Sequence, residues 1–511
     1  MTRDPDVAVA GLAAVTLGLV LAPVALNGFL PLEDLANHIA RRHIMAAPAD
    51  GPLAAYYSHA PTLGTNAAVD LVWRAAGRHL TDAITFSRLA VGGALAGFVL
   101  SVAILHRVLH GRWSAWPLAA ALLVHNASLL WGFENFVVTV PLAILAIAAW
   151  IGLADRRPAL RLAVTAAALA LLYAGHVLAL LAYVLFVTGW EAGRLRGGWR
   201  CPRWPELGLI GAVCLAHLGR MAAAGPAGYG SETVFGDAAQ RLDLLLSPFG
   251  RPWLQAAPMP DGLVAQGPML WAGLGLLGFA TALRAGVSLR LAPGAGPALL
   301  LFGLVTLLMP AALSGVVLTQ VRFPYLLLGL ALAATDLRVS AAGLRAGLVA
   351  LLVALVALRS FLFHESARLQ SADIAGLQRL AAAVPAGARV LPVLGGNSER
   401  ATLHWHSAAY LVPFSEAFVP TLFVAGSHDL ALRPEWRRLS APQPVAAPVE
   451  KLVRPRDLSP SWDYLATWEA DYTHLLAIGL ARGEMPPHLP LREIAREGGT
   501  ALYVLKPPPR G

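Results

Sequence analysis

Charged side chains are scarce in this sequence. Asp, Glu, Lys and Arg make up 14% of its 511 residues, and Lys451 and Lys506 are its two lysines. Soluble globular domains carry about 25% charged residues. The low charge and a mean hydropathy of +0.60 together exclude the soluble globular class.

Cysteine is equally rare, with Cys201 and Cys214 as its two representatives. One falls in a predicted cytoplasmic loop and the other in a predicted membrane span, so they predict neither a disulfide nor a cysteine-based metal site. A P-loop and a nucleophile elbow are also missing. Gly273, Gly275 and Gly278 match G-x-G-x-x-G, but they lie within a predicted span with no strand before them, which excludes dinucleotide binding.

Two histidines have the spacing of metal ligands. His404 and His406 are separated by one residue, yet no cysteine or carboxylate cluster stands close to them. We interpret them as a structural pair. The sequence therefore assigns no cofactor with certainty and leaves a divalent metal open.

Long apolar runs dominate instead. Hydrophobic residues make up 57% of the chain, and they recur in runs of about 14 to 25 residues, which is the length of a membrane helix. The net charge of +9 would suggest nucleic-acid binding in a soluble protein. Here the arginines gather in short loops between the runs, where they predict cytoplasmic orientation instead. These clusters are Arg107 and Arg112; Arg156, Arg157 and Arg161; Arg194, Arg196, Arg200 and Arg203; Arg284 and Arg290; and Arg338 and Arg345.

This pattern predicts a mainly α, polytopic membrane helix bundle of about eleven spans. We expect the first span to be a retained signal anchor rather than a cleaved signal peptide. Basic flanks on both sides of residues 162–190 require an even number of crossings, so we interpret that segment as a helical hairpin. The spans are expected near 7–26, 83–106, 116–130, 136–153, 162–174, 177–190, 206–224, 269–284, 296–312, 323–335 and 346–363.

The topology divides the chain into a transmembrane domain, 1–363, and a terminal domain, 364–511. Three segments are expected on the outer side of the membrane: loop 27–82, loop 225–268 and the terminal domain. The terminal domain holds a helical stretch near 365–384 and three strand candidates, ARVLPVL, YTHLLAIG and TALYVLK, with an amphipathic turn at LREIAREGG. Alternation of strand and helix patterns predicts a small α/β domain.

The first outer loop carries an acidic pair, Glu33 and Asp34. Ionisable groups at a membrane boundary are costly to desolvate and are functional-site candidates. If 32–45 is helical, Asp34, His38 and Arg41 share one face, and Leu35 and Ile39 suit a position along the membrane surface. A carboxylate can accept a proton, and cations can hold phosphate. The competing interpretation is that Asp34 merely caps the helix.

Three more polar groups fall on the same side of the membrane. Glu134 and Asn135 lie in the turn between spans three and four, Tyr173 and His176 between spans five and six, and Arg322 where span ten begins. Each has an ordinary structural explanation, such as capping or snorkelling. Their shared side makes them candidate pocket residues.

Short motifs at these positions resemble the GT-C superfamily of membrane glycosyltransferases, in particular an uncharacterised bacterial branch. They are D-x-x-N-H-x-x-R at 34–41, W-G-F-x-N-F at 131–136, Y-x-G-H at 173–176, R-F-x-x at 322–325 and DYTHLLAIG at 471–479. The resemblance implies a protein of the bacterial inner membrane with its terminal domain in the periplasm.

The resemblance also implies a reaction. An inverting glycosyltransferase would move a sugar from a polyprenyl-phosphate donor to a lipid or glycan acceptor, with Asp34 as the general base and Glu33 as its acidic neighbour. Their side of the membrane and their charge indicate four candidates for binding the phosphate: Arg322, His176, Arg41 and Arg42. The expected substrate site is completed by His38, Glu134, Asn135 and Tyr173. Many members carry a further acidic residue in a second outer loop, and here Glu134 or Glu232 would fill that place.

The alternative is a non-catalytic membrane transporter, lipid-handling or assembly protein. A transporter predicts charges deep within spans and inverted repeats. His217 and Arg220 are the nearest to mid-span charges, and no clear internal repeat is present in the sequence.

Overall fold

The computed structural model describes residues 5–505 except 60–63, 197–202, 225–232, 239–240, 242–246, 250–274, 277, 280–285, 314–315, 397–402, 404, 425–429, 443 and 454–459. Within these residues, seven helices are long and apolar enough to cross a membrane. They are α1 (Pro5–Leu26), α5 (Ala83–His110), α7 (Glu134–Gly152), α8 (Pro158–Gly175), α9 (Val177–Arg196), α10 (Trp204–Ala224) and α16 (Ala342–Ala381).

Three shorter apolar segments complete the described bundle: Trp116–Leu130, Ala295–Leu308 and Gln320–Ala334. The first contains η3 (Trp116–Leu123) and α6 (Ala127–Leu130), the second is α14, and the third contains η5 (Gln320–Arg322) and α15 (Pro324–Ala334). The span expected at 269–284 lies almost wholly outside the described residues, as does most of loop 225–268. The predicted hairpin is confirmed, because α8 ends at Gly175 and α9 begins at Val177.

Local sequence explains where these helices begin and end. Asp82 accepts hydrogen bonds from the backbone N–H groups of Ile84 and Thr85, both at 2.9 Å, and so caps α5. The same helix ends at Gly111, whose φ of 72° favours glycine. Pro158 opens α8 at a position where a missing N–H costs nothing.

The C-terminal unit, residues 388–505, is a five-stranded sheet with short helical segments. Its strand order is β10-β11-β9-β6-β8, in which β6 runs parallel to β8 and β9 while β9, β11 and β10 are antiparallel. LREIAREGG, expected as an amphipathic turn, contains the whole of strand β10 instead, because short alternating segments fit a strand edge as well as a turn. The strands are β6 (Val390–Leu394), β8 (Ala447–Pro448), β9 (His474–Ile478), β10 (Leu491–Glu497) and β11 (Thr500–Leu505).

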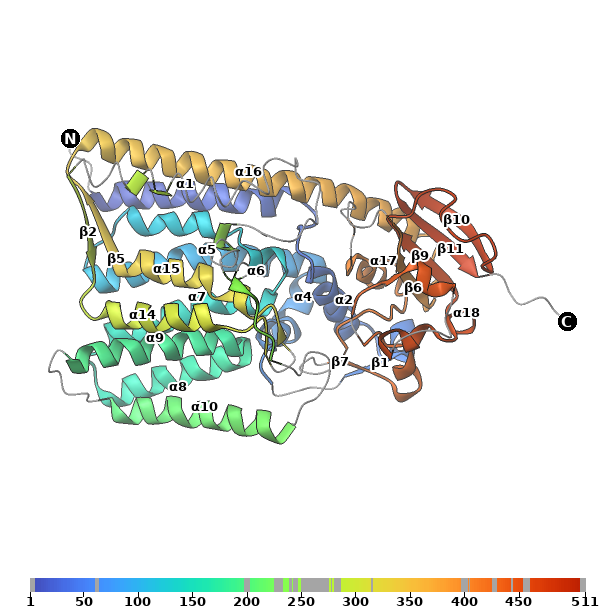
Figure 1. The fold of residues 1–511 in the computed structure, drawn as a ribbon, viewed down its shortest axis with the longest axis horizontal. Helices are drawn as coiled ribbons and strands as arrows, with labels where there is room; N and C mark the ends of the chain where they lie inside the picture. Colours follow the sequence, from blue (N-terminus) through green and yellow to red (C-terminus); the bar gives the residue numbers. More distant parts are fainter. Residues whose placement is uncertain are drawn as a thin grey trace.

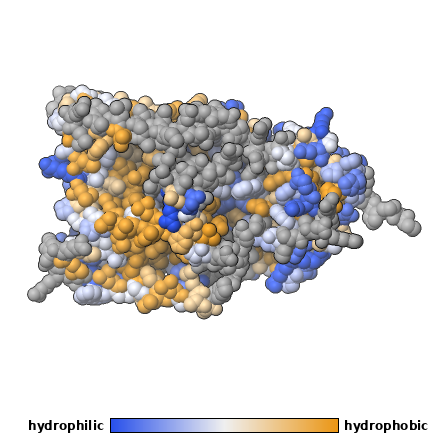
Figure 2. Space-filling model, in the orientation of Figure 1, coloured by the Kyte–Doolittle hydropathy of each residue, from blue (hydrophilic) through white to orange (hydrophobic). Residues whose placement is uncertain are grey.

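One helix joins the two parts of the molecule. The last expected span, 346–363, and the helical stretch near 365–384 are a single element, α16, which runs beside α1 and reaches the C-terminal unit (Figure 1). The division at residue 363 therefore falls inside this helix. Hydrophobic residues gather over the bundle and hydrophilic ones over the C-terminal unit on the face shown in Figure 2. The chain is a multi-pass membrane protein.

Loop 27–82 is bound to the C-terminal unit by strand pairing. Strand β1 (Tyr57–His59) pairs with β7 (Leu430–Leu432), and Tyr57 lies opposite Leu432. Tyr56 donates its hydroxyl hydrogen to the backbone carbonyl of Gly387 at 2.6 Å. At the other end of the bundle, β2 (Val287–Leu291) pairs with β5 (Thr335–Val339), as Figure 1 shows. The loop and the C-terminal unit thus form one structural layer over one end of the bundle.

Candidate functional site

Asp34 precedes helix α2 (Leu35–Ala46), which lies between the bundle and the C-terminal unit (Figure 1). Its carboxylate makes no capping hydrogen bond with α2, so the capping interpretation is wrong. Nearly every residue of α2 is buried. Leu35 and Ile39 accordingly pack inside the protein rather than along a membrane surface, because the C-terminal unit covers the helix.

The tryptophan-glycine motif fixes the backbone of the acidic pair. Glu33 N donates to Leu130 O at 3.1 Å, and Asp34 N donates to Trp131 O at 3.0 Å. Gly132 follows with a φ of +78°, and a Cβ there would lie 2.7 Å from Asp34 N. Only glycine combines that φ with so close an approach. Two motifs far apart in the sequence therefore form one local structure.

A cavity of about 300 Å³ opens beside Asp34. It brings together predicted residues from four separate chain segments. Phe133 and Phe136, together with Phe423 of the C-terminal unit, add apolar surface to it. Its other lining residues are Asp34, His38, Thr65, Asn66, Glu134, Asn135, His176, Val177, Val317 and Arg322.

Arg322 gives this cavity a cationic wall, and His176 lies beside it. Arg322 Nη1 is 2.7 Å from His176 Nε2, and both side chains are buried. The guanidinium lies over the Phe133 ring, 4.0 Å from its centroid. Burial and then the charge of Arg322 hold the pKa of His176 well below its usual range, so its imidazole is neutral.

The contact between Arg322 and His176 has a fixed direction. A guanidinium has no acceptor, so Arg322 Nη1 donates to His176 Nε2 at 2.7 Å, and His176 thereby orients the guanidinium. The other N–H groups of Arg322 are also donors. In the described structure Arg322 Nε has no hydrogen-bond partner. Such a group of donors suits an anionic oxygen.

Arg41 and Arg42 lie behind the cavity rather than in its lining. Arg41 bonds Asp70 at 2.9 Å through Nε and contacts His38 Nδ1 at 3.1 Å through Nη2. Arg42 forms a bidentate pair with Glu134, with one contact at 3.0 Å, and also lies 3.3 Å from Asp70. All four charged side chains are buried. This network holds α2 against α7.

A second glycine sets the position of the turn that carries His176. A Cβ on Gly175 would lie 2.3 Å from Thr139 Oγ1 on α7. Asn135, one turn earlier on α7, donates to Asn66 O at 2.9 Å and accepts from Val69 N at 3.3 Å. These contacts hold together, around the cavity, the N-terminal end of α7, the C-terminal end of α8 and loop 27–82.

Two predicted residues lie elsewhere. Tyr173 contacts His217 at 3.4 Å and, with Arg220, lines a separate cavity of about 390 Å³ between α8 and α10. Glu33 is half-buried and does not line the cavity beside Asp34. Glu232 lies outside the described residues.

Sequence reasoning did not predict the contribution of the C-terminal unit. His406 Nε2 lies 3.3 Å from Asp34 Oδ1. Trp405 contacts Trp131, with ring centroids 6.2 Å apart, and Phe423 is edge-on to both His38 and His406. The spacing of His404 and His406 was visible in the sequence, but nothing in it pointed to Asp34. His404 lies outside the described residues.

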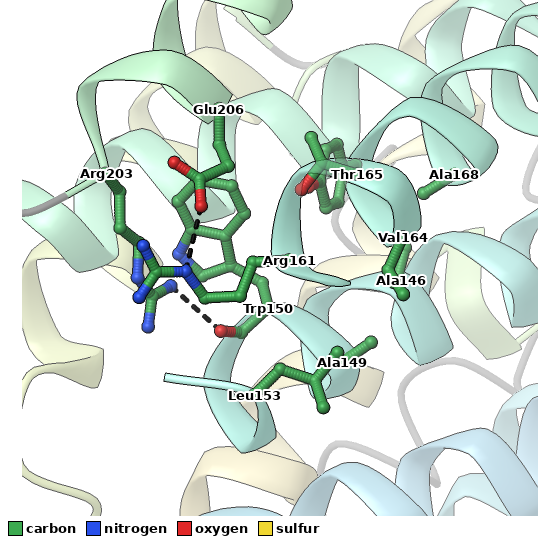
Figure 3. Close-up of a pocket in the computed structure, with 11 residues that line it drawn as sticks. Ala146, Ala149, Trp150, Leu153, Arg161, Val164, Thr165, Ala168, Arg203 and Glu206 are labelled. Atoms are coloured by element: carbon green, nitrogen blue, oxygen red, sulfur yellow. Dashed lines mark hydrogen bonds and ion pairs between the residues drawn. The ribbon is translucent and has the colours of Figure 1, made fainter. Parts of the chain in front are cut away.

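Another polar cluster lies at the opposite end of α7. Arg161 pairs with Glu206 at 2.9 Å, and Arg203 donates to Trp150 O at 2.8 Å (Figure 3). The cavity between them is about 10 Å³, which is near the minimum for one water molecule. This cluster stabilises the helix ends and leaves no space for a substrate.

We find no metal-binding set among the described residues. No three His, Cys, Asp or Glu side chains there are placed to share an ion.

The bundle and the C-terminal α/β unit together define a GT-C-like membrane fold. The structure is similar to the crystal structure of ArnT from Cupriavidus metallidurans in the apo state, with a TM-score of 0.52, 14% sequence identity and 97% of each chain covered. The predicted fold class is thereby confirmed. No protein-family model and no curated protein sequence matches the chain.

Proposed function

We propose that this protein is an inverting glycosyltransferase that moves a sugar from a polyprenyl-phosphate donor to a lipid or glycan acceptor on the periplasmic face. One observation carries the proposal: Asp34, a carboxylate, lines the same cavity as the guanidinium of Arg322, which His176 orients. A base for the acceptor and a binding site for a leaving phosphate are the two groups that such a transfer needs.

The reaction follows from these positions. Asp34 accepts the proton of an acceptor hydroxyl as that oxygen forms a bond to C1 of the sugar. The bond from C1 to the phosphate oxygen breaks on the opposite face, so the configuration at C1 inverts. Arg322, oriented by His176, donates hydrogen bonds to the phosphate as its negative charge grows.

Arg41 and Arg42 take a different role in this proposal. Both are already paired with buried carboxylates, and neither lines the cavity. Releasing them to bind phosphate would leave Asp70 and Glu134 as unpaired buried charges, which is costly. We assign them to holding α2, and hence Asp34, in place.

Sugar transfer by the purified protein tests the proposal. Wild type is incubated with undecaprenyl-phosphate pentoses and hexoses and an extract of envelope lipids and glycans, and Asp34→Asn is compared with Asp155→Asn, an exposed aspartate of the same charge. We expect the transfer rate of Asp34→Asn to fall at least about a hundredfold. Asp155→Asn should keep the wild-type rate. Full activity in Asp34→Asn would reject the base, and lipid movement without transfer would favour the transport alternative.

A further inference from the structure

We propose that His406 is a positioning residue for Asp34, so that the C-terminal unit completes the catalytic site. This inference rests on the proposed transfer reaction. Its basis is the contact of His406 Nε2 with Asp34 Oδ1 at 3.3 Å, across two segments more than 370 residues apart. The His406 side chain is 7% exposed and that of Asp34 17%, so water screens the contact little.

The geometry explains what His406 would do. A carboxylate has two oxygens, and a donor bound to one of them fixes the plane and rotamer that present the other. Because α2 takes no capping bond from Asp34, the orientation of the carboxylate is not set by its own helix. His406 contacts Oδ1 and would thereby restrict the rotamer of a carboxylate that lines the cavity.

His406 is itself held rigidly. It precedes η7 (Ser407–Tyr410), and its carbonyl accepts from Ala409 N at 2.9 Å. Phe423 lies edge-on between His406 and His38, with centroid distances of 5.4 and 5.8 Å. Both η7 and the following helix α17 (Leu411–Ser415) pack against α2. A rigid support is what a positioning residue requires.

Beyond His406, the C-terminal unit is fixed to the first outer loop by the pairing of β1 with β7 and by side-chain hydrogen bonds. Trp436 Nε1 donates to Ala55 O at 3.0 Å, and Arg433 Nε donates to Ala54 O at 2.7 Å. These bonds fix the first outer loop, which begins at Asp34's own segment, to the unit that carries His406. The cavity is therefore a composite of bundle and C-terminal unit rather than a property of the bundle.

Steady-state kinetics with three variants of the full-length protein test this role. His406→Ala removes the donor, His406→Gln keeps an N–H donor near Nε2, and His488→Ala changes an exposed histidine of the same unit. We expect His406→Ala to lower kcat on the order of tenfold to a hundredfold with KM little changed. His406→Gln should recover most of that loss, and His488→Ala should match wild type.

The outcomes separate this inference from the proposed function. Unimpaired kcat in His406→Ala, or an equal loss in the glutamine variant, would overturn the positioning role while the transferase stands. No transfer by wild type would remove the transferase and this role together. As a second readout, thermal unfolding of Asp34→Asn, His406→Ala and the double variant should give shifts in Tm that are not additive, and additive shifts would overturn the contact.

Discussion

At the residue scale, Gly132 determines whether Asp34 can occupy its place. The backbone of Asp34 passes so close to this glycine that any side chain would collide with its amide nitrogen. The motif around Gly132 and the acidic pair are separated by nearly a hundred residues, yet they share two backbone hydrogen bonds. The sequence predicted only that these two motifs lie on the same side of the membrane, and not that they are in contact.

We predict that Gly132→Ala destabilises the protein and abolishes transfer. The positive φ costs alanine about 1 kcal/mol or more, and a Cβ 2.7 Å from Asp34 N displaces the base. Gly343→Ala is the matched control, since a Cβ at that helical glycine meets nothing within 4 Å. Thermal unfolding and transfer rate are measured for both. Wild-type stability and rate in Gly132→Ala would contradict the close approach.

At the scale of elements, the buried charges join α2 to α7. Arg42 is 0% exposed and Glu134 3%, so solvent does not reach either partner of the bidentate pair. Buried ion pairs add little net stability against apolar substitutes, but breaking one is costly. The pair therefore fixes the position of α2 more than it stabilises the bundle.

Two variants distinguish these effects. Glu134→Ala leaves Arg41 and Arg42 to share Asp70, so one positive charge of the buried cluster is uncompensated. We expect a loss of about 3–5 kcal/mol in the free energy of unfolding. The double variant Arg42→Met with Glu134→Leu should lose much less, because no charge stays buried unpaired. Denaturant unfolding in detergent measures both. A double variant less stable than Glu134→Ala would show that packing, rather than charge, dominates here.

The elements could be predicted because their signals are local. Runs of apolar residues predict spans, and the basic loops predict the hairpin at α8 and α9 that the structure confirms. The His406 contact with Asp34 could not be predicted, because a single pair of residues so distant in sequence leaves no periodic trace. The partners of Arg41 and Arg42 were missed for a related reason: charge alone does not reveal that Asp70 and Glu134 neutralise both.

At the scale of the whole molecule, we predict that the two ends of the bundle lie in different compartments. The positive-inside rule predicts that the arginine-rich loops are cytoplasmic and hence that the C-terminal unit is periplasmic. The polar cluster in Figure 3 lies near these arginine-rich loops, at the end of α7 away from Asp34. The proposed transfer requires this orientation.

Cysteine labelling of intact cells checks the orientation. With Cys201 and Cys214 replaced by serine, single cysteines are introduced as Glu469→Cys in the C-terminal unit and Asp155→Cys in the turn before α8, both at exposed positions. A membrane-impermeant thiol reagent admitted to the periplasm should label the first and spare the second until the membrane is opened. The reverse pattern would place Asp34 in the cytoplasm and end the proposed function.

The strand pairing between β1 and β7 has a consequence for biosynthesis. Tyr57 is synthesised early, whereas its partner Leu432 is synthesised after all the described membrane helices. Contacts so distant along the chain form late, because the loop between them has to close first. The membrane helices are therefore inserted before the C-terminal unit pairs with the first loop. A nascent chain stalled before residue 432 would be inserted in the membrane but would lack this pairing.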